Sequence, residues 1–176
     1  MIDKENTVSS DLIYTGKTVS LRVDTVEVPN KGYQKREIVE HNGVVAIIAI
    51  TEDNKIILVR QYRKSIEDVV LEIPAGKLEL NENPRECAMR EFRQKTGYSA
   101  ENFKLIHKFY PSVGFSNQMM FIYLASKIQK CEDKSEDQQL AVEELDFDEV
   151  YKMVLNNEIL DGKTSIGVLL SKDMLN

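Results

Sequence analysis

The chain has 176 residues, 42% of them hydrophobic, which is enough for one domain with a buried core and a small appendage. A formal net charge of −6 argues against nonspecific binding to nucleic acid or to an anionic membrane surface. No apolar run is long enough to span a bilayer, and the acidic segment MIDKENTVSSD at the start has no signal-peptide core. The two cysteines, Cys87 and Cys131, lack the spacing of a metal site, so we expect free thiols in a cytoplasmic protein.

Residues 1–41 predict a small antiparallel sheet ahead of a main domain at residues 42–176. Short alternating runs between Leu12 and Val28 favour two strands, and a turn at Pro29–Gly32 leads to a third strand at Gln34–Val39. A sheet of this size is marginal alone and gains from a partner surface. We therefore expect this segment to form a homodimer.

Three apolar stretches follow in the main domain. Val44–Ile50 is a continuous, mostly β-branched run, typical of a strand buried on both faces. After a turn at Glu52–Asn54, Lys55–Tyr62 is predicted to return as the hairpin partner of that strand. Val69–Gly76 is predicted as one further strand.

The best-defined local signal is a helix over residues 84–96. Asn83 is a cap-type residue, Pro84 suits the first helical turn, and Gly97 suits the left-handed residue that closes a helix. The spacing of the apolar residues predicts that Cys87, Ala88 and Phe92 face a core.

The rest of the chain predicts a strand pair and two more helices. Phe103–Tyr110 and Phe121–Ile128 are expected to pair, and the charged segment Gln129–Gln139 is expected to be a solvated loop. Asp146–Asn156 has the spacing of an amphipathic helix, and Thr164 is expected to cap a last helix at Ser165–Leu175.

The stretch GKLELNENPRECAMREFRQKTGY, residues 76–98, resembles the Nudix box, G-x5-E-x7-R-E-U-x-E-E-x-G-U, where U is a bulky apolar residue. Seven positions match in register: Gly76, Glu82, Arg90, Glu91, Phe92, Gly97 and Tyr98. Gln94 and Lys95 replace the two late glutamates. The resemblance implies an α+β chain with the Nudix fold, an α/β/α sandwich with a mixed sheet, preceded here by the small N-terminal sheet.

The resemblance also implies hydrolysis of a nucleoside diphosphate linked to another group, assisted by Mg²⁺ or Mn²⁺. It assigns Glu82 and Glu91 to catalysis and metal binding and the carbonyl of Ala75 to a backbone metal ligand. Such ions need oxygen ligands, and an ammonium group has no acceptor to offer. Lys95 lies four residues after Glu91, so we expect it to pair with that acid and take the metal's electrostatic place.

Further motifs resemble the ADP-ribose pyrophosphatase branch of the family. They are R-Q-Y-R at residues 60–63, L-E-I-P-A-G at 71–76, Y-P-S-V-G-F-S at 110–116, where Val113 replaces a proline, and the turn before Thr164. The branch implies ADP-ribose or a related nucleoside-diphosphate sugar as substrate, released as AMP plus a sugar phosphate. It also implies a homodimer that exchanges the N-terminal segment.

Carried over from this branch, the expected substrate-binding residues are Arg36, Glu37, Arg63, Gly114, Phe115 and Gln118. Glu136 corresponds to the base that activates water, although a glutamate in a charged loop is ordinarily only solvated. The alternative for Arg36 and Glu37 is a pair of strand-edge charges. The alternative for Arg63 is a surface ion pair with Glu67 or Asp68.

Two interpretations of individual residues stay open. Glu72 either contacts substrate or bonds Arg90, which ties the helix to the loop before it. Adenine needs an aromatic or apolar clamp, for which Tyr14, Tyr33 and Phe115 are unranked candidates.

Three functions are compatible with the sequence: a working hydrolase, a nucleotide-sugar sensor without catalysis, and a structural relative with a disused pocket. The loss of acidic residues at the family's metal positions favours weak or lost turnover over a fully active hydrolase.

Overall fold

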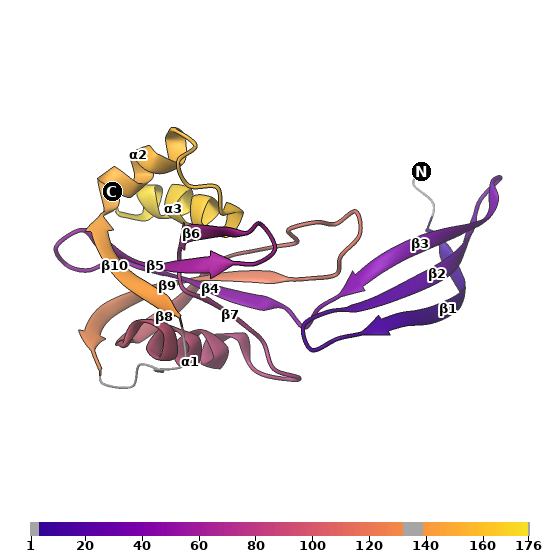
Figure 1. Cartoon of the computed structure of the whole chain (residues 1–176), viewed down its shortest axis with the longest axis horizontal. Helices are drawn as coiled ribbons and strands as arrows, with labels where there is room; N and C mark the ends of the chain where they lie inside the picture. The colour runs from indigo at the N-terminus through magenta and orange to yellow at the C-terminus, as the bar shows by residue number, and fades with distance from the viewer. Residues whose placement is uncertain (1–3, 132–138, 176) are drawn as a thin grey trace. The chain divides into compact units, whose positions relative to one another are not determined.

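The computed structural model describes residues 4–131 and 139–175 (Figure 1). The chain divides into two compact units. The first is the chain up to Gly43 together with Phe109–Met120, and the second is Val44–Lys108 with the chain from Phe121 onward. No helix of the described residues is long and apolar enough to cross a membrane.

The first unit contains a three-stranded antiparallel sheet in the order β1-β2-β3, as predicted. Its strands are β1 at Asn6–Thr15, β2 at Ser20–Val28 and β3 at Gly32–Glu40. Strand β1 begins six residues before Leu12, and it is exposed along its whole length.

The segment Phe109–Met120 belongs to the same unit, which the local sequence pattern did not indicate. The amide of Val39 donates to the carbonyl of Phe115 at 2.8 Å, and the amide of Asn117 donates to the carbonyl of Val39 at 3.2 Å. The side chain of Asn117 also accepts a bond from the amide of His41 at 2.9 Å. These bonds fix the turn that carries Gly114 and Phe115 beside the end of β3.

The second unit has two sheets. One has the order β7-β4-β9-β8, and the other has the order β10-β5-β6. The strands are β4 Val44–Ala49, β5 Lys55–Arg63, β6 Asp68–Glu72, β7 Ala75–Lys77, β8 Tyr98–Phe109, β9 Met120–Lys130 and β10 Leu140–Asp146. Strands β4 and β5 supply the centre of the core, with Val45 to Ala49 and Ile56 to Val59 almost fully buried.

Among the described residues, three helices cover these sheets: α1 Pro84–Thr96, α2 Phe147–Leu155 and α3 Gly162–Leu175. Helix α1 packs against β4 and β7. Helix α2 packs against β5 and β10, and α3 packs against β4. Figure 1 shows α1 on one side of the strands and the α2–α3 pair on the other. The α+β fold class expected for a Nudix chain is confirmed.

Helix α1 has the predicted bounds, and both caps act as expected. The side chain of Asn83 accepts a hydrogen bond from the amide of Arg85 at 2.9 Å. Gly97 adopts φ 72°, and its amide donates to the carbonyl of Arg93 at 2.9 Å. The predicted core face, Cys87, Ala88 and Phe92, is fully buried.

Two predictions about strands were wrong. The expected hairpin of Val44–Ile50 with Lys55–Tyr62 does not form, because β4 already has β7 and β9 as neighbours, and only an isolated bridge joins Ile50 to Ile56. The expected strand Val69–Gly76 is divided into β6 and β7, which lie in different sheets. Pro74 lies at the break, and proline cannot donate to a strand ladder.

The C-terminal part differs in two further ways. Strand β10 was not predicted, because its sequence LAVEELD carries too many charges for an obvious strand. Helix α3 begins at Gly162 and not at Ser165. Asp161 caps it by accepting from the amide of Thr164 at 3.0 Å. The hydroxyl of Thr164, the predicted cap, is buried and accepts from the amide of Ile73 at 2.9 Å.

Candidate active site

Strand β7 brings its backbone against an acid of α1. A Cβ atom placed on Gly76 would lie 1.9 Å from Cδ of Glu91 and 2.1 Å from its Oε2. Any side chain at position 76 would therefore displace the Glu91 carboxylate. Glycine is needed here for close approach.

Arg90 ties the loop to the helix, as the sequence suggested. Its Nε and Nη2 donate to the two carboxylate oxygens of Glu82 at 2.9 and 3.0 Å, and its Nη1 donates to Oε1 of Glu91 at 2.6 Å. Glu82 also accepts from the amide of Glu79 at 2.9 Å. The hydrogen bonds from Arg90 lower the pKa of Glu82 to about 2. Burial acts in the opposite direction, and the amide of Glu79 lowers the pKa further.

Lys95 reaches back from the last turn of α1 to β7. Its Nζ donates to the carbonyl oxygen of Ala75 and lies 3.9 Å from Oε2 of Glu91. The predicted pairing of Lys95 with Glu91 is confirmed. Both side chains are 12% exposed. Burial lowers the pKa of Lys95, and the carboxylate of Glu91 opposes that effect.

These contacts decide whether the predicted ligands suit Mg²⁺ or Mn²⁺. The Ala75 carbonyl accepts from an ammonium, Glu91 lies between a guanidinium and that ammonium, and both oxygens of Glu82 are bonded to Arg90. Among the described residues, no three acids, histidines or cysteines are grouped so as to hold a metal. A divalent cation would have to approach a buried ammonium of like charge. The described donor set therefore does not fit such an ion.

A second ionic cluster surrounds Glu72, which is almost fully buried. Arg63 Nε donates to its Oε1 at 2.7 Å, and Lys163 donates to its Oε2. Lys163 also donates to Asp161 at 2.8 Å. Burial acts to raise the pKa of Glu72, but the bonds from Arg63 and the charge of Lys163 hold it below its usual value.

This cluster excludes two of the alternatives that the sequence left open. Glu72 does not bond Arg90, and Arg63 does not pair with Glu67 or Asp68. Lys163 was not predicted as a site residue, although it lies within the turn whose sequence resembles the family's I-x-D-A-K-T. The two clusters are neighbours along the chain, because Glu72, which bonds Arg63 and Lys163, lies three residues before Ala75, which bonds Lys95.

The remaining predicted residues belong to the first unit or lie outside the described residues. Arg36 donates to both carboxylate oxygens of Glu5, at 2.9 and 2.6 Å. Four belong to the same first unit as Arg36: Glu37, Gly114, Phe115 and Gln118. The candidate adenine clamps Tyr14, Tyr33 and Phe115 are all more than half exposed. Glu136 lies outside the described residues.

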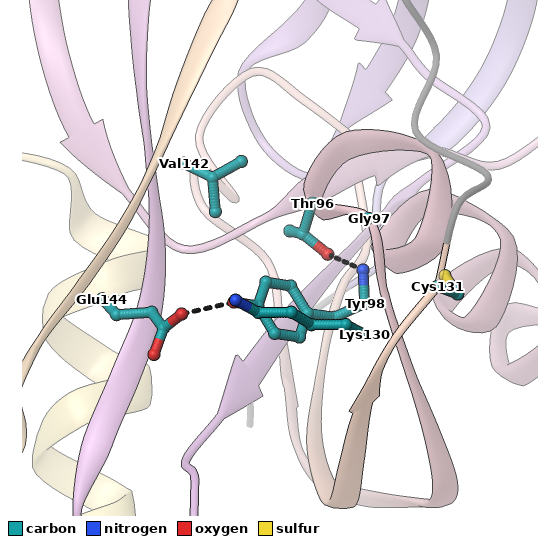
Figure 2. Close-up of a pocket in the computed structure, with 7 residues that line it drawn as sticks. All are labelled: Thr96, Gly97, Tyr98, Lys130, Cys131, Val142 and Glu144. Carbon is teal, nitrogen blue, oxygen red and sulfur yellow. Dashed lines mark hydrogen bonds between the residues drawn. The ribbon is translucent and has the colours of Figure 1, made fainter.

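A separate pocket of about 450 Å³ lies beside the end of α1, and its lining residues are drawn in Figure 2. The Tyr98 hydroxyl donates to the Glu144 carboxylate there, and Lys130 Nζ lies 5.8 Å from the centre of the Tyr98 ring. Burial and Glu144 raise the pKa of Tyr98 to about 12. The other lining residues are Thr96, Gly97, Cys131 and Val142, and none of the seven was predicted as a site residue.

A family model described as the NUDIX domain matches residues 40–164. This chain belongs to the Nudix family. The match spans residues 76–98, so the predicted family is confirmed. Nudix enzymes that act on ADP-ribose generally use Mg²⁺ or Mn²⁺, and Lys95 sets this Nudix chain apart from that pattern.

Similar proteins extend the comparison to nearly the full chain. The ADP-ribose pyrophosphatase of Bacillus subtilis (strain 168) is 40% identical over 168 residues, which cover 94% of this chain and 91% of that protein. The methanol dehydrogenase activator of Bacillus methanolicus is 43% identical with the same coverage. A solved ADP compounds hydrolase shares the Nudix fold, with a TM-score of 0.86 and 16% identity over 99% of this chain and 96% of that one.

Proposed function

We propose that this Nudix chain binds ADP-ribose or a related nucleoside-diphosphate sugar, and that its metal-dependent hydrolysis to AMP and a sugar phosphate is weak or lost. The contact that carries this proposal is the bond from Lys95 to the Ala75 carbonyl, with Glu91 3.9 Å away. The ligand class is supported by the similar protein from Bacillus subtilis, which is named for ADP-ribose.

Hydrolysis of a diphosphate requires neutralisation of the charge that develops on phosphate oxygens and activation of a water molecule. In the family pattern, three carboxylates near the end of the helix hold the ions that supply both effects. In this chain the same turn keeps one carboxylate, at Glu91, beside an amide and an ammonium. Losing one catalytic carboxylate lowers a rate by about a hundred-fold to ten-thousand-fold, and here two are replaced.

Ligand recognition in this proposal begins with Arg63. Arg63 suits a phosphate because a guanidinium donates several hydrogen bonds in fixed geometry. The family correspondence assigns the rest of the ligand to Arg36, Glu37, Gly114, Phe115 and Gln118. Glu82, Glu91 and Glu136 are the residues through which residual hydrolysis would proceed.

We also propose a cytoplasmic homodimer formed through the segment before residue 42, with the Nudix domain at residues 42–176. Four large apolar side chains of β1 are more than half exposed: Val8, Leu12, Ile13 and Tyr14. A sheet of three strands with such an exposed surface gains stability from a second copy.

A regulatory module that binds without hydrolysis is the second candidate. The same Lys95 contact favours it, because removal of metal ligands impairs hydrolysis more than it impairs binding. The similar protein from Bacillus methanolicus is named as an activator of a dehydrogenase and not as a hydrolase.

The test is AMP release from ADP-ribose with Mg²⁺ or Mn²⁺, compared between the unmodified chain and the double variant Gln94→Glu, Lys95→Glu. We expect little release from the unmodified chain and an increase of at least about a hundredfold in the variant. Rapid turnover by the unmodified chain would overturn the loss of activity. Failure to bind any nucleoside-diphosphate sugar in calorimetry would overturn the ligand class.

A further inference from the structure

Three cationic side chains from three different elements bond one short stretch of the chain, Glu72–Ala75. Arg63 comes from the end of β5, Lys95 from the last turn of α1, and Lys163 from the first turn of α3. Arg63 and Lys163 donate hydrogen bonds to Glu72, and Lys95 donates one to the carbonyl of Ala75. The bonds hold all three side chains in place before any ligand arrives.

Each cation keeps hydrogen-bond donors that the described residues do not use. Arg63 bonds Glu72 through Nε alone, which leaves Nη1 and Nη2. An ammonium has three donors. Lys163 uses two, on Glu72 and Asp161, and Lys95 uses one on Ala75 with a longer contact to Glu91. Together they can still donate at least four hydrogen bonds.

The substitutions in the Nudix box change the charge that a ligand meets. Relative to two glutamates, Gln94 adds one positive unit and Lys95 adds two, so the helix end carries three more positive units than the family pattern. One divalent ion supplies only two positive units. In the family pattern a diphosphate needs a metal ion between itself and three carboxylates. Here the helix end is already positive enough to attract the diphosphate without that ion.

We infer that Arg63, Lys95 and Lys163 form a subsite that binds the diphosphate of a ligand without a divalent ion, with Lys163 as a ligand-binding residue. This inference rests on the proposed nucleoside-diphosphate ligand and adds how it is recognised. A preformed set of donors binds a charged group without the entropy loss of ordering long side chains. A diphosphate offers several negatively charged oxygen atoms, enough to accept hydrogen bonds from all of these free cationic donors.

The role of Glu72 follows from the same geometry. Arg63 and Lys163 bond the two oxygens of one carboxylate, so their positive charges lie close together and repel each other. Glu72 is buried and bonds two of the three cations, which relieves that repulsion while leaving their other donors free. It acts as a positioning residue for the subsite.

The experiment is calorimetric titration of the full chain with ADP-ribose, once in EDTA and once in magnesium. The variants are Lys163→Gln, Lys163→Arg and a matched control, Lys172→Gln. Lys172 lies on the same helix and also forms an ion pair, with Asp148. It is in the last turn of α3, whereas Lys163 is in the first turn. Thermal unfolding of each variant verifies that it is folded.

We expect ADP-ribose to bind in EDTA with an affinity within about threefold of that in magnesium, and Lys163→Gln to weaken it about tenfold in both buffers. Lys163→Arg keeps the charge and should restore most of the affinity, and Lys172→Gln should bind like the unmodified chain. Binding that requires magnesium, or an equal loss in Lys172→Gln, would overturn the inference while leaving the proposed ligand intact.

Absence of ADP-ribose binding in both buffers would instead overturn the proposed function. Inorganic pyrophosphate titrated in EDTA then decides the inference by itself. Binding that Lys163→Gln weakens supports the subsite, and no binding, or binding that is insensitive to this change, overturns it.

Discussion

The ammonium of Lys95 donates to the carbonyl oxygen of Ala75, twenty residues earlier in the chain, and lies 3.9 Å from the carboxylate of Glu91. The contact ties β7 to α1 through a side chain. Because this cation is covalently part of the chain, the strand and the helix are held together at any metal concentration.

Magnesium should therefore leave the stability of the unmodified chain unchanged and should stabilise Lys95→Glu. That variant places two carboxylates four residues apart on one helix face and leaves the Ala75 carbonyl without its donor, so it should unfold at a lower temperature in EDTA. An ion that binds only the folded state raises its stability. Thermal unfolding of both proteins with EDTA or millimolar magnesium measures the difference. A clear magnesium-dependent rise in the unmodified chain would contradict this prediction.

Substitution of Gly76 by alanine should destabilise the chain by about 1–3 kcal/mol, the range for overpacking. The added Cβ would meet the Glu91 side chain at 1.9 to 2.1 Å, so the carboxylate must leave its place between Arg90 and Lys95. Gly162→Ala is the matched control, because a Cβ there meets nothing within 4 Å. Urea unfolding of both variants gives the two free energies. Equal values would show that the close approach at Gly76 is tolerated.

The parts of the fold that the sequence predicted are those set by neighbours along the chain. Helix α1 was predicted with its exact ends because Asn83, Pro84 and Gly97 act through local backbone bonds. The Lys95–Glu91 pair was predicted because residues four apart share a helix face. The family resemblance added the roles of the loop, which periodicity alone does not reveal.

The parts that were missed depend on contacts between distant segments. Lys163 meets Glu72 across 91 residues, and no local pattern indicates which cation a buried acid will find. The turn after β4 was recognised, but the hairpin was wrong because β4 has neighbours from other parts of the chain on both edges. The joining of Phe109–Met120 to the first unit depends likewise on bonds to Val39, far away in sequence.

Replacement of Glu82 by glutamine should remove a pH-dependent part of the stability. The folded-state pKa of Glu82 is about 2, below the ordinary value of 4.5, so its contribution is present above about pH 4.5 and is lost as the pH falls toward 2. At pH 7 the variant should be less stable by about 1–2 kcal/mol, allowing for partial exposure of the ion pair with Arg90. Urea unfolding at several pH values tests this. A stability gap that stays constant from pH 7 to pH 2 would contradict it.

The two cysteines should react very differently with a thiol reagent in the folded chain. Cys87 is fully buried on the core face of α1, and burial together with the nearby Glu82 raises its pKa to about 12, so almost no thiolate is present. Cys131 is partly exposed beside the pocket shown in Figure 2. We expect one rapidly reacting thiol in the native chain and two after denaturation. The variant Cys131→Ser should lose the rapid reaction and keep one thiol on unfolding, whereas rapid labelling of two native thiols would show that Cys87 is open to solvent.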